Sequence, residues 1–171
     1  PGNNNITGGT ASGNMAANEG GGFWNGSGIM TLSGVTVTGN DAAGEDVDVA
    51  GAAGGGGLFN EGGTIALTDS SVVSNNTATG ARSTGGGVLN AAGTFTAVDS
   101  EISGNESNRA GGGIETNGAS SVELTNVALD GNSTGVVTGA GAPGNGGGLH
   151  VSGAAPVTIT GGTVSGNFAA K

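Results

Sequence analysis

Apolar and polar residues alternate along this chain in short stretches that recur every 26 to 35 residues. A glycine triplet followed by an apolar residue opens each repeat. The triplets begin at Gly20, Gly55, Gly85, Gly111 and Gly146. A second alternating stretch follows each triplet, and a third ends at Asn40, Asn76, Asn105, Asn132 and Asn167. Because successive side chains of a strand point to opposite faces, this period of two predicts three short strands per repeat.

The side chains expected to point inward are apolar in all three strands. The first strands contribute Phe23, Leu58, Val88, Ile114 and Leu149. The second strands contribute Leu32, Ile65, Leu67, Phe95, Val122, Leu124, Val157 and Ile159, and the third strands Val37, Val73, Ile102, Leu129 and Val164. Their outward neighbours in the third strands are small and polar: Thr38, Ser74, Ser103, Asp130 and Ser165.

Three short strands in a unit of 26 residues predict one coil of a parallel β-helix. We therefore expect an all-β protein with one solenoid domain over residues 1–171, built from about five to six coils. The coils are expected to begin near residues 20, 55, 85, 111 and 146, after a partial coil over residues 1–19. Residues 41–54, 77–84 and 133–145 are insertions that should leave the solenoid at one corner.

Composition supports this architecture and excludes several others. Glycine supplies 41 of 171 residues, which disfavours helical bundles, and the glycines lack the three-residue period of collagen. The formal net charge of −10, with only three Lys and Arg, excludes a nucleic-acid groove. No apolar stretch reaches the roughly 20 residues that span a bilayer, so we expect no membrane insertion. Cysteine is absent, which leaves the redox compartment undetermined.

The coil at residues 55–78, GGGLFNEGGTIALTDSSVVSNNTA, carries the repeat most fully. This pattern resembles the right-handed parallel β-helix repeats of bacterial cell-surface and secreted proteins, including the polymorphic outer-membrane proteins and adhesin-like passenger regions. The resemblance implies a right-handed solenoid and an extracellular location at the bacterial surface. It does not imply one function, because the same architecture hosts adhesins, polysaccharide lyases and hydrolases, phage spikes and ice binders.

The two ends of the chain are in the same phase of the repeat. Residues 6–17 and residues 159–170 are identical at ten of twelve positions. Two interpretations stay open. The chain is a window on a longer solenoid whose adjoining coils cover both ends, or it is a unit that stacks head to tail with copies of itself, which would pair the open strand edges.

One outward column offers a candidate binding surface. It consists of Trp24, Phe59, Leu89, Glu115 and His150, each one residue after an inward position of the first strand. Trp24, Phe59 and Leu89 would form an exposed apolar stripe that contacts another protein or stacks on a sugar ring. The alternative is that an insertion, most simply residues 41–54, folds over the stripe and buries it.

Two further sets of polar residues are candidates for a site or for structure. The acidic run Glu45, Asp46 and Asp48 could hold calcium, although a solvated loop without a ligand is the favoured interpretation. Asn25, Asn60 and Asn90 share one position in successive coils and are expected to stack as a hydrogen-bonded structural ladder. Asp69, Asp99 and Asn126 are expected to be turn residues, and Arg82 and Arg109 to form surface ion pairs beside Glu106.

Catalysis is not expected, since the carboxylates on neighbouring coils, Glu101 and Asp130, have no accompanying base or cation site and are interpreted as surface charges. No lysine precedes residue 171, and His150, the single histidine, more simply decorates a strand than acts as a base. We therefore expect a non-catalytic extracellular structural or adhesive module without a cofactor. Its expected partners are copies of itself or adjoining coils. The alternative is a carbohydrate-binding adhesin segment that uses Trp24 and Phe59.

Overall fold

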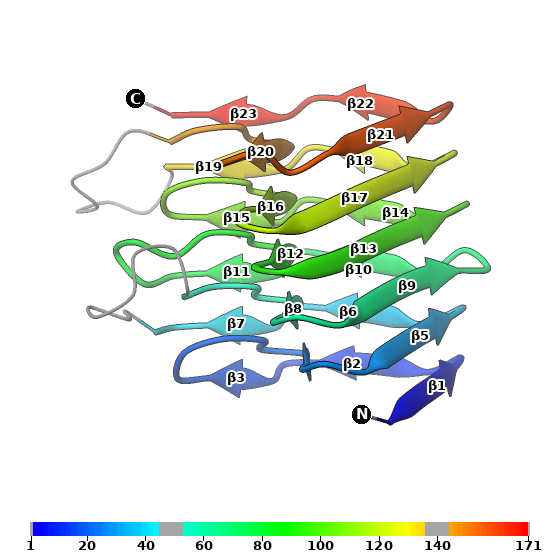
Figure 1. Cartoon of the computed structure of the whole chain (residues 1–171). Coiled ribbons are helices and arrows are strands. Elements are labelled where there is room, and N and C mark those ends of the chain that lie inside the picture. Colours follow the sequence, from blue (N-terminus) through cyan, green and yellow to red (C-terminus); the bar gives the residue numbers. More distant parts are fainter. Residues whose placement is uncertain (1, 45–52, 136–143, 171) are drawn as a thin grey trace.

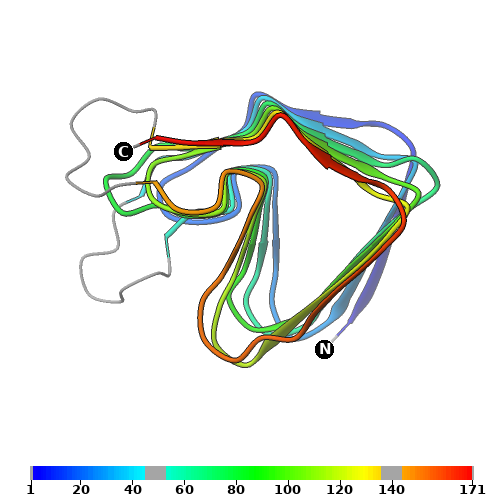
Figure 2. The ribbon, with the colours of Figure 1, turned by 90° about the horizontal axis from the view of Figure 1, so that it is seen from above.

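The computed structural model describes residues 2–44, 53–135 and 144–170, and it is a parallel β-helix (Figure 1). Every strand pair in the described residues is parallel, and equivalent segments of successive coils lie directly above one another in four sheets. In the view from above, the chain runs counter-clockwise as it rises towards the viewer, so the helix is right-handed (Figure 2). The predicted fold class is therefore confirmed.

Three of the four sheets correspond to the three predicted strands of each coil. The first-strand sheet contains β4 (Phe23–Asn25), β8 (Leu58–Asn60), β12 (Val88–Asn90), β16 (Ile114–Thr116) and β20 (Leu149–Val151). The second-strand sheet contains β1 (Asn3–Thr7), β5 (Ile29–Ser33), β9 (Thr64–Thr68), β13 (Gly93–Val98), β17 (Ser120–Thr125) and β21 (Val157–Thr160). The third-strand sheet contains β2 (Thr10–Ser12), β6 (Thr36–Thr38), β10 (Val72–Ser74), β14 (Glu101–Ser103), β18 (Ala128–Asp130) and β22 (Thr163–Ser165).

A fourth sheet, which the sequence pattern did not indicate, is built from strands of only two residues. It contains β3 (Met15–Ala16), β7 (Asp41–Ala42), β11 (Thr77–Ala78), β15 (Glu106–Ser107), β19 (Ser133–Thr134) and β23 (Phe168–Ala169). Two residues are too few to show a period of two. β7, β11 and β19 occupy the first two residues of the three predicted insertions. The insertions therefore differ in length only after these strands.

The apolar interior is the one expected from the alternation. All three predicted inward columns pair in register, as in the ladder Phe23, Leu58, Val88, Ile114 and Leu149. In the central coils these side chains are fully or almost fully buried, and Met30 and Ala97 join them from the second strands. The terminal coils differ, because they have a neighbouring coil on one side only: Ile159 is 44% exposed and Val164 is 58% exposed.

A ladder of asparagines runs through the interior at the end of the third strands. Within the described residues it includes Asn14, Asn40, Asn76, Asn105, Asn132 and Asn167. The Oδ1 of Asn76 accepts hydrogen bonds from the backbone N–H and the Nδ2 of Asn40, at 3.0 and 2.9 Å. The Nδ2 of Asn76 donates to the Oδ1 of Asn105 and back to the carbonyl of Val37, both at 3.0 Å. Each amide therefore joins its coil to the coils on both sides.

The glycine triplets pack against this ladder, and each glycine has its own physical reason. Gly55 has a φ of +66°, a left-handed backbone conformation that residues other than glycine rarely adopt. A Cβ on Gly56 would lie 2.1 Å from the carbonyl oxygen of Thr77, in the fourth strand of the same coil. A Cβ on Gly57 would lie 2.9 Å from the Nδ2 of Asn76. The triplet thus lets two parts of one coil approach each other and narrows the coil into a waist (Figure 2).

We expect replacement of one buried ladder residue, Asn76→Ala, to destabilise the fold by about 3 kcal/mol. The substitution leaves the backbone N–H and Nδ2 of Asn40 and the carbonyl of Val37 without their partners in the interior, and each such group costs roughly 1–3 kcal/mol. Thermal or urea unfolding monitored by circular dichroism measures the change.

The matched control is the preceding residue, Asn75→Gly. Asn75 is exposed and has a φ of +52°, so glycine should preserve or slightly raise stability. Equal unfolding midpoints for the two variants would contradict a stabilising role of the ladder.

Candidate functional site

The column that contains the aromatic residues and the single histidine lies in a re-entrant angle of the coil. Register places Trp24, Phe59, Leu89, Glu115 and His150 one above another in the first-strand sheet. The outer side of this sheet faces the angle between the first strands and the part of the coil that precedes the triplets (Figure 2). This column therefore lies in a concave corner and not on a convex side of the rod.

The predicted exposed stripe is wrong for two of its three residues. Trp24 is 48% exposed, but Phe59 is 4% exposed and Leu89 is fully buried. The preceding triplet lies close to both residues, since a Cβ on Gly55 would lie 3.1 Å from the Cβ of Phe59 and one on Gly85 would lie 2.8 Å from the Cα of Leu89. Phe59 and Leu89 are thus buried, as the alternative expected, whereas Trp24 is not. Residues 45–52, the middle of the insertion expected to cover the stripe, lie outside the described residues.

Trp24 keeps its exposure because it stands on β4, the edge strand of the first-strand sheet. One face of its ring stacks on Phe59, with ring centroids 6.3 Å apart and an interplanar angle of 24°. A single aromatic face therefore remains where the sequence predicted a platform of three side chains.

The other end of the column holds a buried carboxylate with two polar partners. Glu115 is 2% exposed. Its Oε2 lies 2.7 Å from the Nδ1 of His150, and its Oε1 accepts a hydrogen bond of 3.0 Å from the Oγ of Ser152. This is the one ion pair with histidine, lysine or arginine among the described residues. It joins the fourth full coil to the fifth.

Burial is the main influence on Glu115 and raises its pKa above the ordinary value of 4.5. His150, the hydroxyl of Ser152 and the charge of Arg109 oppose this rise by stabilising the carboxylate. The sequence pattern places Glu115 and His150 in one column but does not pair them. An acidic residue and a histidine at neighbouring ladder positions were the signal that could have identified the contact.

The predicted ladder of Asn25, Asn60 and Asn90 is present. The Nδ2 of Asn25 donates to the Oδ1 of Asn60 at 2.9 Å, and that of Asn60 donates to the Oδ1 of Asn90 at 2.8 Å. Asn90 then contacts the hydroxyl of Thr116, at 3.4 Å, in the next coil. All three asparagines are buried, which agrees with a structural role.

The other predicted site residues do not come together as a site. Glu45, Asp46 and Asp48 lie outside the described residues, and the described part of the chain holds no group of three potential metal ligands. Arg82 and Arg109 are exposed, and neither forms an ion pair with Glu106 within the described ranges. The backbone N–H of Arg109 donates to the carbonyl of Ser83, so the two arginines are one position out of register.

Asp69, Asp99 and Asn126 are turn residues, as expected. All three have left-handed φ values, of 55°, 47° and 53°. Ser33 and Thr68 donate hydrogen bonds to the carboxylate of Asp69, which lowers its pKa.

Comparisons with protein-family models, curated proteins and solved structures find no match to this chain. The family resemblance and the extracellular location therefore stay predictions. No helix in the described residues is long and apolar enough to cross a bilayer.

We expect Glu115→Gln to raise stability at pH 7 by about 1 kcal/mol, because the glutamine keeps polar contacts to His150 and Ser152 without burying a charge. Folding raises the pKa of Glu115, so the native fold is favoured when this group is protonated and loses that advantage as pH rises through the raised pKa. The gain from glutamine should therefore disappear as pH falls below that pKa.

Unfolding midpoints of the two proteins across pH 3–8 measure this effect. Glu123→Gln is the matched control, because Glu123 is exposed on β17 and its replacement should change stability little at any pH. A wild-type protein that is more stable than the Glu115→Gln variant at pH 7 would show that the His150 contact outweighs the cost of burial.

Proposed function

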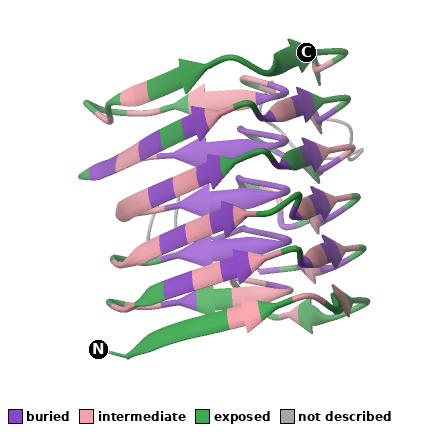
Figure 3. Cartoon of the chain, turned by 90° about the vertical axis from the view of Figure 1, so that its right-hand side faces the viewer, coloured by how far each residue is buried: buried purple, intermediate pink, exposed green. Residues whose placement is uncertain are grey.

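We propose that this protein is a non-catalytic structural rod that grows by end-to-end stacking of its coils, with a second copy as its partner. The main support is that, among the described residues, apolar positions that are buried in the central coils are exposed in the first and last coils. Figure 3 shows the first and last coils largely exposed, while the strands of the central coils are mostly buried or partly buried.

Apolar side chains that are buried in the central coils are exposed at the C-terminal face. Val164 is 58% exposed, whereas Leu129, its neighbour in the same ladder, is 1% exposed. Ile159 is 44% exposed, whereas its ladder neighbour Leu124 is 2% exposed. At the N-terminal face, Ile6 is only partly buried. Covering both faces with one further coil would remove these side chains from water.

The hydrogen-bonding groups of the two faces are complementary. Within the described residues Asn14 donates to Asn40, but its own Oδ1 accepts no bond. At the other end the Nδ2 of Asn167 donates only to the carbonyl of Leu129, and its backbone N–H has no partner among the described residues. Stacking the N-terminal face of one copy on the C-terminal face of another would bring these donors to that acceptor, as in every interior step of the ladder.

Charge favours contact at the ends over contact along the sides. Twelve of the 13 acidic residues lie between Asp41 and Asp130, and Glu19 is the exception. Like charges on the sides oppose lateral association, whereas the two end faces carry almost no charge to oppose stacking. The near-identity of residues 6–17 and 159–170 gives the two faces the same repeat phase.

The carbohydrate-binding alternative has less support, since Phe59 and Leu89 are buried and only Trp24 remains exposed. An adjoining coil of a longer chain would cover the same faces as a second copy. With the resemblance to bacterial surface β-helices, we place the rod outside the cell.

We expect the chain to form elongated assemblies as its concentration rises, and the double variant Val164→Lys and Ile159→Lys to remain monomeric. Two buried ammonium groups in an apolar interface would prevent stacking. Sedimentation velocity and negative-stain electron microscopy measure assembly, and circular dichroism verifies the fold.

The matched control is Thr38→Lys with Ser103→Lys, which adds the same charge to the side of the rod and should leave assembly intact. A monodisperse wild-type monomer at high concentration would refute the proposal, as would equal loss of assembly in the control.

A further inference from the structure

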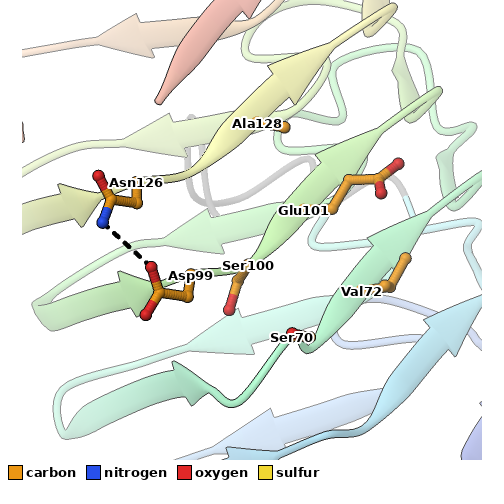
Figure 4. A pocket seen from close by; sticks show the side chains of 7 residues that line it. All are labelled: Ser70, Val72, Asp99, Ser100, Glu101, Asn126 and Ala128. Carbon is orange, nitrogen blue, oxygen red and sulfur yellow. Dashed lines mark hydrogen bonds between the residues drawn. The ribbon is translucent and has the colours of Figure 1, made fainter. Parts of the chain in front are cut away.

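A shallow groove of about 380 Å³ crosses the corner between the second and third strands of the three central coils (Figure 4). It lies where β9, β13 and β17 end and where β10, β14 and β18 begin. Seven residues line it: Ser70, Val72, Asp99, Ser100, Glu101, Asn126 and Ala128. Its volume falls within the range of small-ligand sites.

One extra residue and two small side chains shape this groove. The turn between β9 and β10 has three residues, whereas the equivalent turns between β13 and β14 and between β17 and β18 have two. The extra residue places Ser70 at one end of the groove. Val72 and Ala128 stand on either side of Glu101 in the third-strand sheet and leave an apolar floor beside its longer side chain.

Polar side chains occupy the turn of the central coils at the position where the outer coils have glycine. The first turn residue after the second strand is Gly8, Gly34 or Gly161 in the outer coils, each with a left-handed φ. In the central coils the same position is occupied by Asp69, Asp99 and Asn126, again with left-handed φ. Aspartate and asparagine adopt this conformation more readily than most other non-glycine residues, so the turn accepts them, and they give the central coils a polar corner that the outer coils lack.

The groove offers mostly hydrogen-bond acceptors around an apolar floor. Asp99 and Asn126 lie on one side, joined by a hydrogen bond of 3.1 Å from Nδ2 to Oδ1, and Glu101 lies opposite (Figure 4). Asp99 and Glu101 are exposed, and each has one carboxylate oxygen that accepts no bond from the described residues. No basic side chain is among the lining residues.

A ligand that fits this chemistry supplies hydroxyl donors, a positive charge and a C–H face for the floor. Anionic sugars are excluded by the two carboxylates and by the net charge of −10. A bare metal ion would make no use of the apolar floor. Asp99 and Glu101 also supply only two carboxylates, whereas a calcium site normally has about six to eight oxygen ligands. A sugar chain that carries protonated amino groups satisfies all three requirements.

We propose that the corner groove of the central coils binds an amino-sugar oligosaccharide, with Asp99 and Glu101 pairing with its ammonium groups and Asn126 with its hydroxyls. This binding site is separate from the end faces and does not rest on the stacking proposed above. It would allow the side of the rod to attach to a surface polysaccharide while its ends remain available.

Isothermal titration calorimetry of the full chain with a glucosamine tetramer at pH 6 tests the proposal. Neutral N-acetylglucosamine tetramer and anionic galacturonate tetramer are the comparison ligands. We expect the glucosamine tetramer to bind most tightly. Asp99→Gly with Glu101→Gln should weaken binding by about tenfold or more, since each charge-assisted contact contributes on the order of one such factor. The glycine copies a turn that the outer coils already use, so this variant should fold.

Two further variants locate the site. Ala128→Phe fills the groove without changing charge and should abolish binding, whereas Glu123→Gln removes one charge elsewhere on the same coil and should not affect it. Absence of binding by the glucosamine tetramer would overturn the proposal. So would undiminished binding to Ala128→Phe, which would indicate general attraction to an acidic rod, or loss of binding in Trp24→Ala alone, which would place the site in the first-strand column.

Discussion

The buried asparagine ladder at the waist of the coil is the interaction on which the rest of this structure depends. A parallel β-helix holds its coils together by backbone hydrogen bonds between short strands, and here the strands of the fourth sheet have only two residues each. The ladder adds three hydrogen bonds that involve a side chain between neighbouring coils, as between the coils of Asn40 and Asn76, at the place where the strands are shortest. Because the amide is planar and bonds upward and downward with the same geometry, it also fixes the register of each coil on the next.

The waist explains why glycine is so abundant and why it occurs in triplets. A coil of ordinary width would have room for side chains between its two halves. Here the triplet passes close to the fourth strand and to the ladder amide, so residues such as Gly56 and Gly57 have no space for a Cβ. The same bend creates the re-entrant angle in which Phe59, Leu89 and Glu115 are buried. The glycines that close the core therefore also determine which outward side chains reach solvent.

Charge is distributed differently over the sides and the ends of the rod, so the two kinds of surface suit different partners. Most acidic residues that the structure describes lie in the central coils, where Asp99 and Glu101 face the corner groove. The end faces are apolar, almost uncharged and complementary in hydrogen bonding. A rod of this kind can offer one chemistry at its ends and another along its side, because stacked coils repeat each outward position as a column parallel to the rod axis.

The sequence by itself determined the coil repeat, the three longer strands, the inward columns and the Asn25, Asn60 and Asn90 ladder. These follow from local alternation and from repetition at a fixed position, both of which are visible along one chain. Only the tertiary structure decided that Phe59 and Leu89 are buried, that Glu115 pairs with His150, and that a groove crosses the central corner. Each of these depends on how one coil bends and on which neighbour lies above it. The alternation of apolar and polar residues predicts which face of a strand a side chain lies on. It does not predict whether the surface of the coil at that face is convex or concave.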